Sequence, residues 1–103
     1  MRTILMFDLP TLKAKQRHDY SVFVRNLKRL GFYMLQESIY IKMDVDSYYS
    51  DMTLKRIKEI KPSEGSIFVL TITEKQFLNM EIILGSINTD VITTTDRLIE
   101  LWY

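Results

Sequence analysis

Asp8 is the residue of this sequence that is best placed to do chemistry. It follows the apolar run from Thr3 to Phe7, which has the composition of a strand buried on both faces. Pro10 then prevents further ladder pairing. The end of a central strand is where open sheets tend to place ligand sites, and a carboxylate there predicts a functional group. Asp is also a good hydrogen-bond acceptor in turns and helix caps, so a purely structural role is the competing interpretation.

A metal site at Asp8 would need more than one chain. Mg²⁺ prefers oxygen ligands in near-octahedral geometry and usually takes one or two carboxylates together with water and phosphate. A two-fold axis between two copies would bring two Asp8 side chains together. The interpretation of Asp8 as a metal ligand therefore depends on a homodimer.

Basic side chains form a second candidate surface, on a helix that the sequence predicts over residues 11–30. Tyr20, Phe23 and Leu27 recur at steps of three and four residues and form an apolar stripe. Thr11 is the expected N-cap and Gly31 the expected stop. At ~100° per residue, the basic positions fall on an arc roughly 160° wide, away from that stripe. They are Lys13, Arg17, Arg25, Lys28 and Arg29. Such an arc would hold a phosphate backbone without reading bases.

The distribution of charge agrees with a polyanion partner. The net charge is only +1, but residues 1–43 carry eight Lys and Arg against three Asp and Glu. Residues 44–103 carry six against ten. An asymmetry of this kind suggests one basic surface for nucleic acid, while two ordinary solvated faces are the alternative.

Several other chemistries lack the residues that they need. Three widely spaced glycines do not make a phosphate loop. Cysteine is absent, which excludes disulfides and thiolate metal sites and fits a reducing cytoplasm. His18 is the sole histidine and is expected on the surface, without an orienting partner. No apolar run reaches about 18 residues, so we expect no membrane span, and no signal-peptide core is visible.

The remaining segments predict the elements that must position these groups. Residues 32–43 are rich in strand formers, and the polar step at Gln36 leaves open a bent strand or a tight hairpin. Asp44, Asp46 and Ser47 are signals for the start of a second amphipathic helix, which Pro62 ends. Further along, residues 66–73 read as a strand, 74–80 as one or two helical turns, and 81–86 as either strand or helix.

This order of elements predicts one α+β domain over residues 1–103, built as a ferredoxin-like βαββαβ sandwich. Residues 97–103 alternate like a further strand and end in Trp102 and Tyr103, large groups that a free tail would leave in water. Such a strand can add itself to a neighbouring sheet edge. We therefore expect a homodimer in which this C-terminal strand pairs with the other protomer.

The same residues resemble a known family. The segments "ILMFDLPT" and "KQRHDYSVFVRNLKRLGFYMLQESIYIK" resemble the CRISPR-associated "Cas two" family, in the variety that accompanies the RNA-guided effector nuclease of type II systems. The segment "GSIFVLTITEKQF" is typical of that variety, and the resemblance covers nearly the whole chain. Its motifs are Met-Phe-Asp-Leu-Pro at the strand end, Arg17-x-x-Tyr20-x-x-Phe23, Gly31-Phe32, and Gln36-x-Ser38-x-Tyr40.

The resemblance implies a role in CRISPR adaptation, the acquisition of new spacers for antiviral defence in the prokaryotic cytoplasm. It implies that the homodimer spans the middle of a duplex prespacer DNA. Two dimers of the partner integrase, "Cas one", would flank it in a heterohexamer. The resemblance also implies a Mg²⁺-dependent endonuclease on RNA or DNA, with Asp8 as catalytic residue and metal ligand. A tendency to contact phosphate carries over to Lys13, Arg17, Arg25 and Lys28.

The sequence is compatible with three functions. The leading one is a duplex-binding scaffold for spacer acquisition with nuclease activity through paired Asp8 residues. The second is a stand-alone metal-dependent endoribonuclease. The third is a ferredoxin-like interaction domain without nucleic acid, which the absence of an integrase gene and a repeat array nearby would favour.

Overall fold

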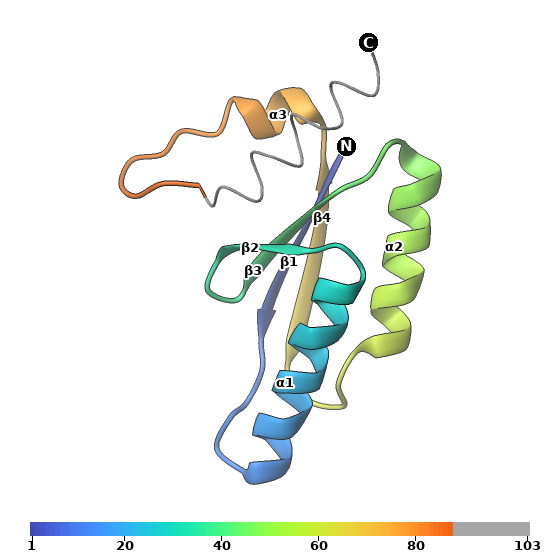
Figure 1. The fold of residues 1–103 in the computed structure, drawn as a ribbon, viewed down its shortest axis with the longest axis vertical. Helices are drawn as coiled ribbons and strands as arrows, with labels where there is room; N and C mark the ends of the chain where they lie inside the picture. The colour runs from blue at the N-terminus through green and yellow to red at the C-terminus, as the bar shows by residue number, and fades with distance from the viewer. Residues whose placement is uncertain (88–103) are drawn as a thin grey trace.

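The strand that carries Asp8 lies in the middle of a four-stranded sheet. The computed structural model describes residues 1–87 of the chain (Figure 1). Its elements are, in order, β1 (Arg2–Asp8), α1 (Ala14–Arg29), β2 (Tyr33–Gln36), β3 (Ile39–Met43), α2 (Ser47–Ile60), β4 (Ser66–Ile72) and α3 (Glu74–Leu78). The strand order is β2-β3-β1-β4, and all neighbours are antiparallel. The predicted α+β plan of βαββαβ type is confirmed, whereas the predicted strand at residues 97–103 lies outside the described residues.

Both long helices cover one face of this sheet (Figure 1). Because side chains alternate along a strand, Leu5 and Phe7 of β1 share the face that packs against Phe23 and Leu27 of α1. The ring of Phe7 meets that of Phe23 edge-on at a centroid distance of 5.5 Å and stacks on Tyr40 at 5.7 Å. Full burial of side chains of this size is worth about 1.5–3 kcal/mol each, so this cluster holds α1 to the sheet.

Residues 32–43 form a hairpin, which resolves the alternative that the sequence left open. β2 and β3 pair antiparallel, with an irregularity between Met34 and Gln36. Ser38 turns the chain between them with a positive φ of 65°. Its carbonyl accepts a hydrogen bond from the Phe7 amide at 3.0 Å, beyond the last paired position of β1 and β3. The hairpin turn therefore contacts the end of β1.

Helix α1 begins later than the sequence predicts. Thr11 is not its N-cap, because that position is taken by Lys13, whose amide donates to the Gln16 side chain at 2.9 Å. The Arg17 guanidinium donates to the carbonyls of Thr11 and Leu12, at 3.2 and 2.8 Å, and holds these residues outside the helix. At the other end Gly31 has a φ of +101°, as expected for a residue that ends a helix.

Two carboxylates expected at the start of α2 have separate roles. Asp46 is the N-cap and accepts from the Tyr49 amide at 3.1 Å, as predicted. Asp44 is instead buried, with 2% of its surface exposed. Its carboxylate accepts from Thr3 Oγ1 at 2.8 Å, from Thr53 Oγ1 at 3.1 Å and from the Lys42 ammonium. Asp44 therefore joins β1, β3 and α2.

Among residues 1–87, the sheet face opposite α1 and α2 is covered only in part. At one end α3 packs over it, where Ile41 and Phe77 form a small buried cluster. Arg2 is buried there, with its Nε 3.0 Å from Glu74 and its guanidinium carbon 4.4 Å from the centre of the Phe77 ring. Residues 81–86, which the sequence left ambiguous, form neither helix nor strand. Within residues 1–87, no helix has the length and apolar character needed to cross a membrane.

Candidate functional site

Asp8 is the last residue of β1, as the sequence predicted, and the structure shows that it is exposed. Residues Ile4, Met6 and Asp8 alternate with Leu5 and Phe7, so Asp8 lies on the sheet face opposite α1 and α2. The side-chain hydrogen bonds found among residues 1–87 do not include its carboxylate. The structural interpretation of Asp8 as a cap or turn acceptor thus has no partner in this part of the chain.

Ser66 is the neighbour of Asp8 that sequence reasoning missed. Because β4 runs antiparallel to β1, the first residue of β4 pairs with the last residue of β1. Side chains directly opposite each other on such a pair lie on the same face, with Cβ atoms about 4.5–5.5 Å apart. The sequence did indicate a turn that ends at Gly65, just before Ser66. Only the strand pairing, however, shows that Ser66 lies opposite Asp8.

The oxygen donors at this position suit a hard divalent cation. A carboxylate and a hydroxyl are the ligand types that Mg²⁺ accepts, with water and phosphate completing its shell. Among residues 1–87 no group of three or more His, Cys, Asp or Glu side chains lies close enough to hold a metal ion. The described part of one chain therefore offers a partial site, and further ligands would come from water, substrate or a second copy.

An aromatic cluster lies behind this strand end, on the helix side of the sheet. Phe7, which precedes Asp8, contacts Tyr20 edge-on at a centroid distance of 5.8 Å and also stacks on Tyr40. Burial raises the pKa of the Tyr40 phenol above its usual value, and the nearby Tyr20 raises it further. Tyr40 is therefore a core residue that packs against Phe7 on the face of the sheet away from Asp8.

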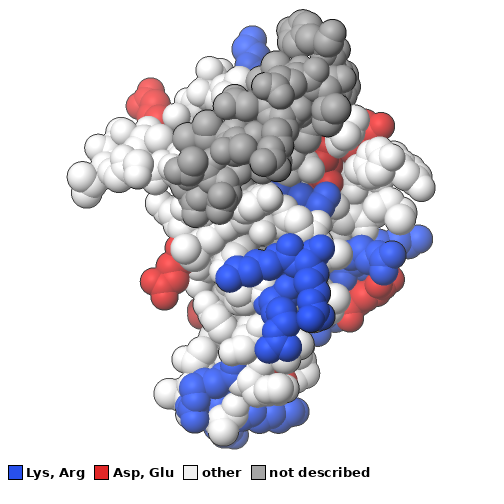
Figure 2. Space-filling model, in the orientation of Figure 1, with Lys and Arg blue, Asp and Glu red and all other residues white. Residues whose placement is uncertain are grey.

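The cationic residues predicted on α1 lie in the helical layer and not around Asp8. Figure 2 shows Lys and Arg side chains gathered over α1 on the face that the helices cover, with acidic side chains mostly at its margins. Lys13, Arg17, Arg25 and Lys28 are all exposed, in agreement with the predicted arc. Lys13 lies at the N-cap position, and Arg17 is engaged by the preceding loop, which leaves Arg25, Lys28 and Arg29 exposed on the body of the helix. Arg25 and Lys28 are the two of these for which the resemblance implied phosphate contacts.

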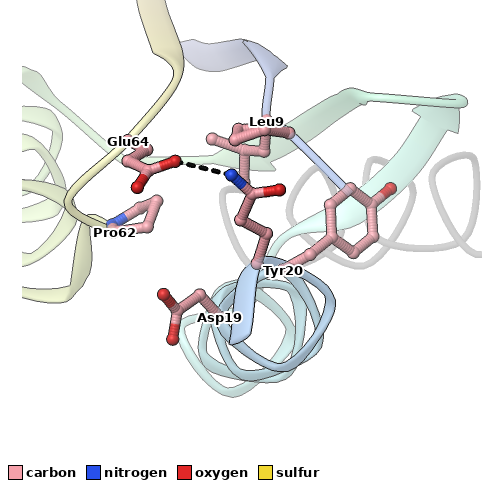
Figure 3. Close-up of a pocket in the computed structure, with 7 residues that line it drawn as sticks. Leu9, Asp19, Tyr20, Pro62 and Glu64 are labelled. Carbon is pink, nitrogen blue, oxygen red and sulfur yellow. Dashed lines mark hydrogen bonds between the residues drawn. The ribbon is translucent and has the colours of Figure 1, made fainter. Parts of the chain in front are cut away.

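A small hollow separates the start of α1 from the turn before β4 (Figure 3). Leu9 and Tyr20 line it on one side, and Pro62 and Glu64 on the other. The Gln16 side-chain amide donates to Glu64 at 2.8 Å, which ties this turn to α1. Among the described residues, this hollow therefore marks the place where α1 and the turn before β4 meet, next to the end of β1.

Comparison with known proteins agrees with this architecture. A family model described as "CRISPR associated protein Cas2" matches residues 1–80. A Treponema denticola protein named "CRISPR-associated endoribonuclease Cas2" is 45% identical over 101 residues, which cover 98% of this chain and 100% of that protein. A Streptococcus mutans protein of the same name is 40% identical over 101 residues, covering 98% of this chain and 93% of that protein.

A solved structure shows the same fold at low sequence identity. The crystal structure of Streptococcus pyogenes Cas2 superposes with a TM-score of 0.60 at 17% identity, over 82% of this chain and 100% of that chain. The family model spans β1 through α3, and therefore includes both Asp8 and the strand that pairs with it. With that match and relatives of near-equal length, the chain belongs to the CRISPR-associated Cas2 family.

Proposed function

We propose that this protein is a homodimeric CRISPR adaptation protein that binds duplex prespacer DNA, bridges integrase dimers, and carries a Mg²⁺-dependent endoribonuclease site at paired Asp8 residues. Its relatives bear the name endoribonuclease, and the family match covers residues 1–80. The observation that carries the proposal is the exposed Asp8 on the sheet face opposite α1 and α2.

A second copy of the chain is the proposed cover of this face. Phe68 and Leu70 of β4 lie opposite Met6 and Ile4 of β1 on this face. The side chains of Phe68 and Leu70 are 68% and 53% exposed. Packing of two such faces around a two-fold axis would bury these side chains in both copies. Each side chain that becomes fully buried would stabilise the dimer by about 1.5–3 kcal/mol. The same contact would bring the two Asp8 residues to the axis. The chain would form one domain over residues 1–103, with residues 97–103 paired to the other protomer.

Asp8 and Ser66, which lie opposite each other at the strand end, would have different roles in hydrolysis. Asp8 from each protomer would hold Mg²⁺, and Ser66 would offer a hydroxyl to the substrate or to the water shell. Bound Mg²⁺ supplies charge stabilisation for the phosphodiester and lowers the pKa of a coordinated water. The apolar neighbours Phe68 and Leu70 would exclude bulk water from the closed interface, which strengthens electrostatic interactions there.

The α1 surface is the proposed site for the duplex. Exposed Arg25 and Lys28 present cations on the layer that faces away from the proposed dimer axis. Contacts of this kind hold the backbone of any sequence, which suits a protein that must accept prespacers of arbitrary sequence. The integrase would then engage the ends of the same duplex.

Replacement of Asp8 tests the nuclease part of this proposal. Asp8→Asn keeps the size of the side chain and removes the charge that a cation needs. We expect the variant to stay dimeric by light scattering and to lose Mg²⁺-dependent cleavage of single-stranded RNA. The matched control is Asp51→Asn, an exposed carboxylate on α2, which should cleave at the wild-type rate. Wild-type cleavage by Asp8→Asn would remove Asp8 from the site.

A scaffold without hydrolysis is the second candidate. It is favoured by the sparse ligand set, since residues 1–87 contain no group of three metal-ligating side chains. In that case wild type and Asp8→Asn would show equal, background cleavage, and both would support spacer integration with the integrase. Duplex binding alone would then account for the role of the dimer.

A further inference from the structure

Gly65 lies against the backbone that follows Asp8. It adopts a φ of +105°, which favours glycine. A Cβ at this position would come within 2.6 Å of Leu9 Cδ2, 2.7 Å of the Asp8 carbonyl oxygen and 3.1 Å of Leu9 Cα. Distances below 3.0 Å are essentially never found for real Cβ atoms, so any larger residue must displace this peptide.

The segment around Gly65 is held on both sides and cannot easily withdraw. Glu64, just before it, accepts a hydrogen bond from the Gln16 side chain at 2.8 Å (Figure 3). Ser66, just after it, begins the pairing of β4 with β1 and is the register partner of Asp8. A side chain added at Gly65 would therefore push on the Asp8–Leu9 peptide.

Ser38 restrains the same strand end from the β3 side. The paired positions of β1 and β3 end at Met6 and Ile39, and the Phe7 amide then donates to the Ser38 carbonyl at 3.0 Å. Ser38 reaches this position with a φ of 65°, the one positive φ of a non-glycine residue among residues 1–87. A residue other than Gly in this conformation is sterically unfavourable, and it persists where its surroundings fix it.

We propose that Gly65 and Ser38 form a backbone clamp, one turn on each side of β1, that fixes the direction of the Asp8 carboxylate. Both would be positioning residues for hydrolysis, acting through the backbone of residues 7–9 without touching substrate. This inference rests on the proposed nuclease function of Asp8. Its physical basis is that a displacement of about 1 Å in a reacting group can lower a rate by about a hundredfold.

Two glycine variants separate positioning from general destabilisation. Gly31 has a similar φ of +101°, but a Cβ there meets only Lys42 Cε at 3.5 Å. Gly65→Ala and Gly31→Ala thus share the backbone strain, and only the first pushes on Asp8. At a temperature where both are folded, we expect Gly65→Ala to lower kcat by about ten- to a hundredfold with KM for RNA within about twofold. It should also raise the Mg²⁺ concentration for half-maximal rate. Gly31→Ala should keep kcat within about twofold, and equal losses in the two variants would overturn the inference.

Ser38 offers a test that does not depend on the folding of Gly65→Ala. Ser38→Gly keeps access to the left-handed conformation and removes the hydroxyl, whereas Ser38→Val disfavours that conformation. We expect Ser38→Gly to retain kcat within about twofold and Ser38→Val to lose at least about tenfold. A loss in Ser38→Gly as large as in Ser38→Val would show that the hydroxyl matters and not the turn.

Backbone NMR distinguishes a failure of the clamp from a failure of the nuclease proposal. If the wild-type protein shows no Mg²⁺-dependent cleavage, the nuclease proposal fails, but the clamp still predicts changes that need no activity. Gly65→Ala should shift the amide resonances of Asp8 and Leu9 and accelerate hydrogen exchange at the Phe7 amide, while Gly31→Ala should not. Unchanged resonances and exchange at residues 7–9 in Gly65→Ala would overturn the clamp.

Discussion

The proposed contribution of α1 to duplex binding would be measured as a change in salt dependence. Arg25 and Lys28 are exposed on α1. Figure 2 shows Lys and Arg side chains gathered over this helix. Each phosphate contact contributes about −0.9 to the slope of log K against log salt for duplex DNA. Removal of two contacts by Arg25→Gln with Lys28→Gln should therefore flatten the slope by about 1.8 for each copy of the helix that touches DNA. Between 50 and 200 mM salt, that difference corresponds to about a tenfold change in relative affinity.

The choice of these two positions follows from the structure. Arg17 belongs to the same predicted arc, but its guanidinium donates to the carbonyls of Thr11 and Leu12 at 3.2 and 2.8 Å. Its replacement would disturb the loop before α1 as well as any phosphate contact. Lys13 lies at the N-cap position, at the opposite end of α1 from Lys28, and its contact with Gln16 is made by its backbone amide and not by its side chain. Replacement by Gln at Arg25 and Lys28 removes charge from helix positions that tolerate Gln well.

Fluorescence anisotropy with two duplexes of unrelated sequence, at several salt concentrations, would measure this change. The matched control is Lys55→Gln with Lys58→Gln on α2, which removes the same charge from another exposed helix. The α1 variant should weaken binding to both duplexes alike, and the α2 variant should leave the slope near that of the wild type. A slope that changes only in the α2 variant would refute the reasoning and move the duplex to that helix.

The other predictions concern stability and assembly. Asp44→Ala should lower the free energy of unfolding by about 3–5 kcal/mol in urea titrations, because it leaves the Lys42 ammonium and two threonine hydroxyls without their buried acceptor; a loss below about 1 kcal/mol would contradict that role. Tyr40 has a folded-state pKa raised above the unfolded value of 10.0, so its contribution is fully present below that pH and is lost as the pH rises through the folded-state pKa. Tyr40→Phe should therefore show a shallower alkaline fall in unfolding free energy, and parallel curves would argue against it. Deletion of residues 97–103 should give a monomeric or aggregated protein by light scattering that fails to hold the integrase, whereas a stable dimer that still assembles would show that the sheet faces suffice.

Sequence periodicity predicted the elements of this fold because their causes are local. The apolar step of three and four residues that joins Tyr20, Phe23 and Leu27 sets which side of α1 is buried, whatever it packs against. The position of Asp8 at the end of a strand follows equally from its immediate neighbours. The N-cap was harder to predict. Lys13 occupies this position in place of Thr11, and the Arg17 side chain donates a hydrogen bond to the carbonyl of the loop residue Leu12 before it.

Contacts between distant segments could not be predicted in the same way. Asp44 has the sequence context of a helix cap, and only the pairing of β1 with β3 brings Thr3 to its carboxylate. Gly65 has the context of an ordinary turn, and its contact with the Asp8 carbonyl depends on the register of β1 with β4. The periodicity of a sequence predicts which face of a helix or strand a residue occupies. It does not predict which residue lies opposite on the neighbouring strand.

The proposed duplex-binding surface and the proposed cleavage site lie on opposite sides of the sheet. Asp8 lies on one face of the sheet, and the cations of α1 lie on the layer that covers the other. If two copies pack through the open face, both Asp8 residues point to the axis and both α1 surfaces point away from it. A duplex held along α1, as proposed, would then lie on the far side of the sheet from either carboxylate, and the protein would carry DNA without cutting it. Cleavage would require a strand to enter between the open faces, which favours flexible single-stranded RNA over a stiff duplex.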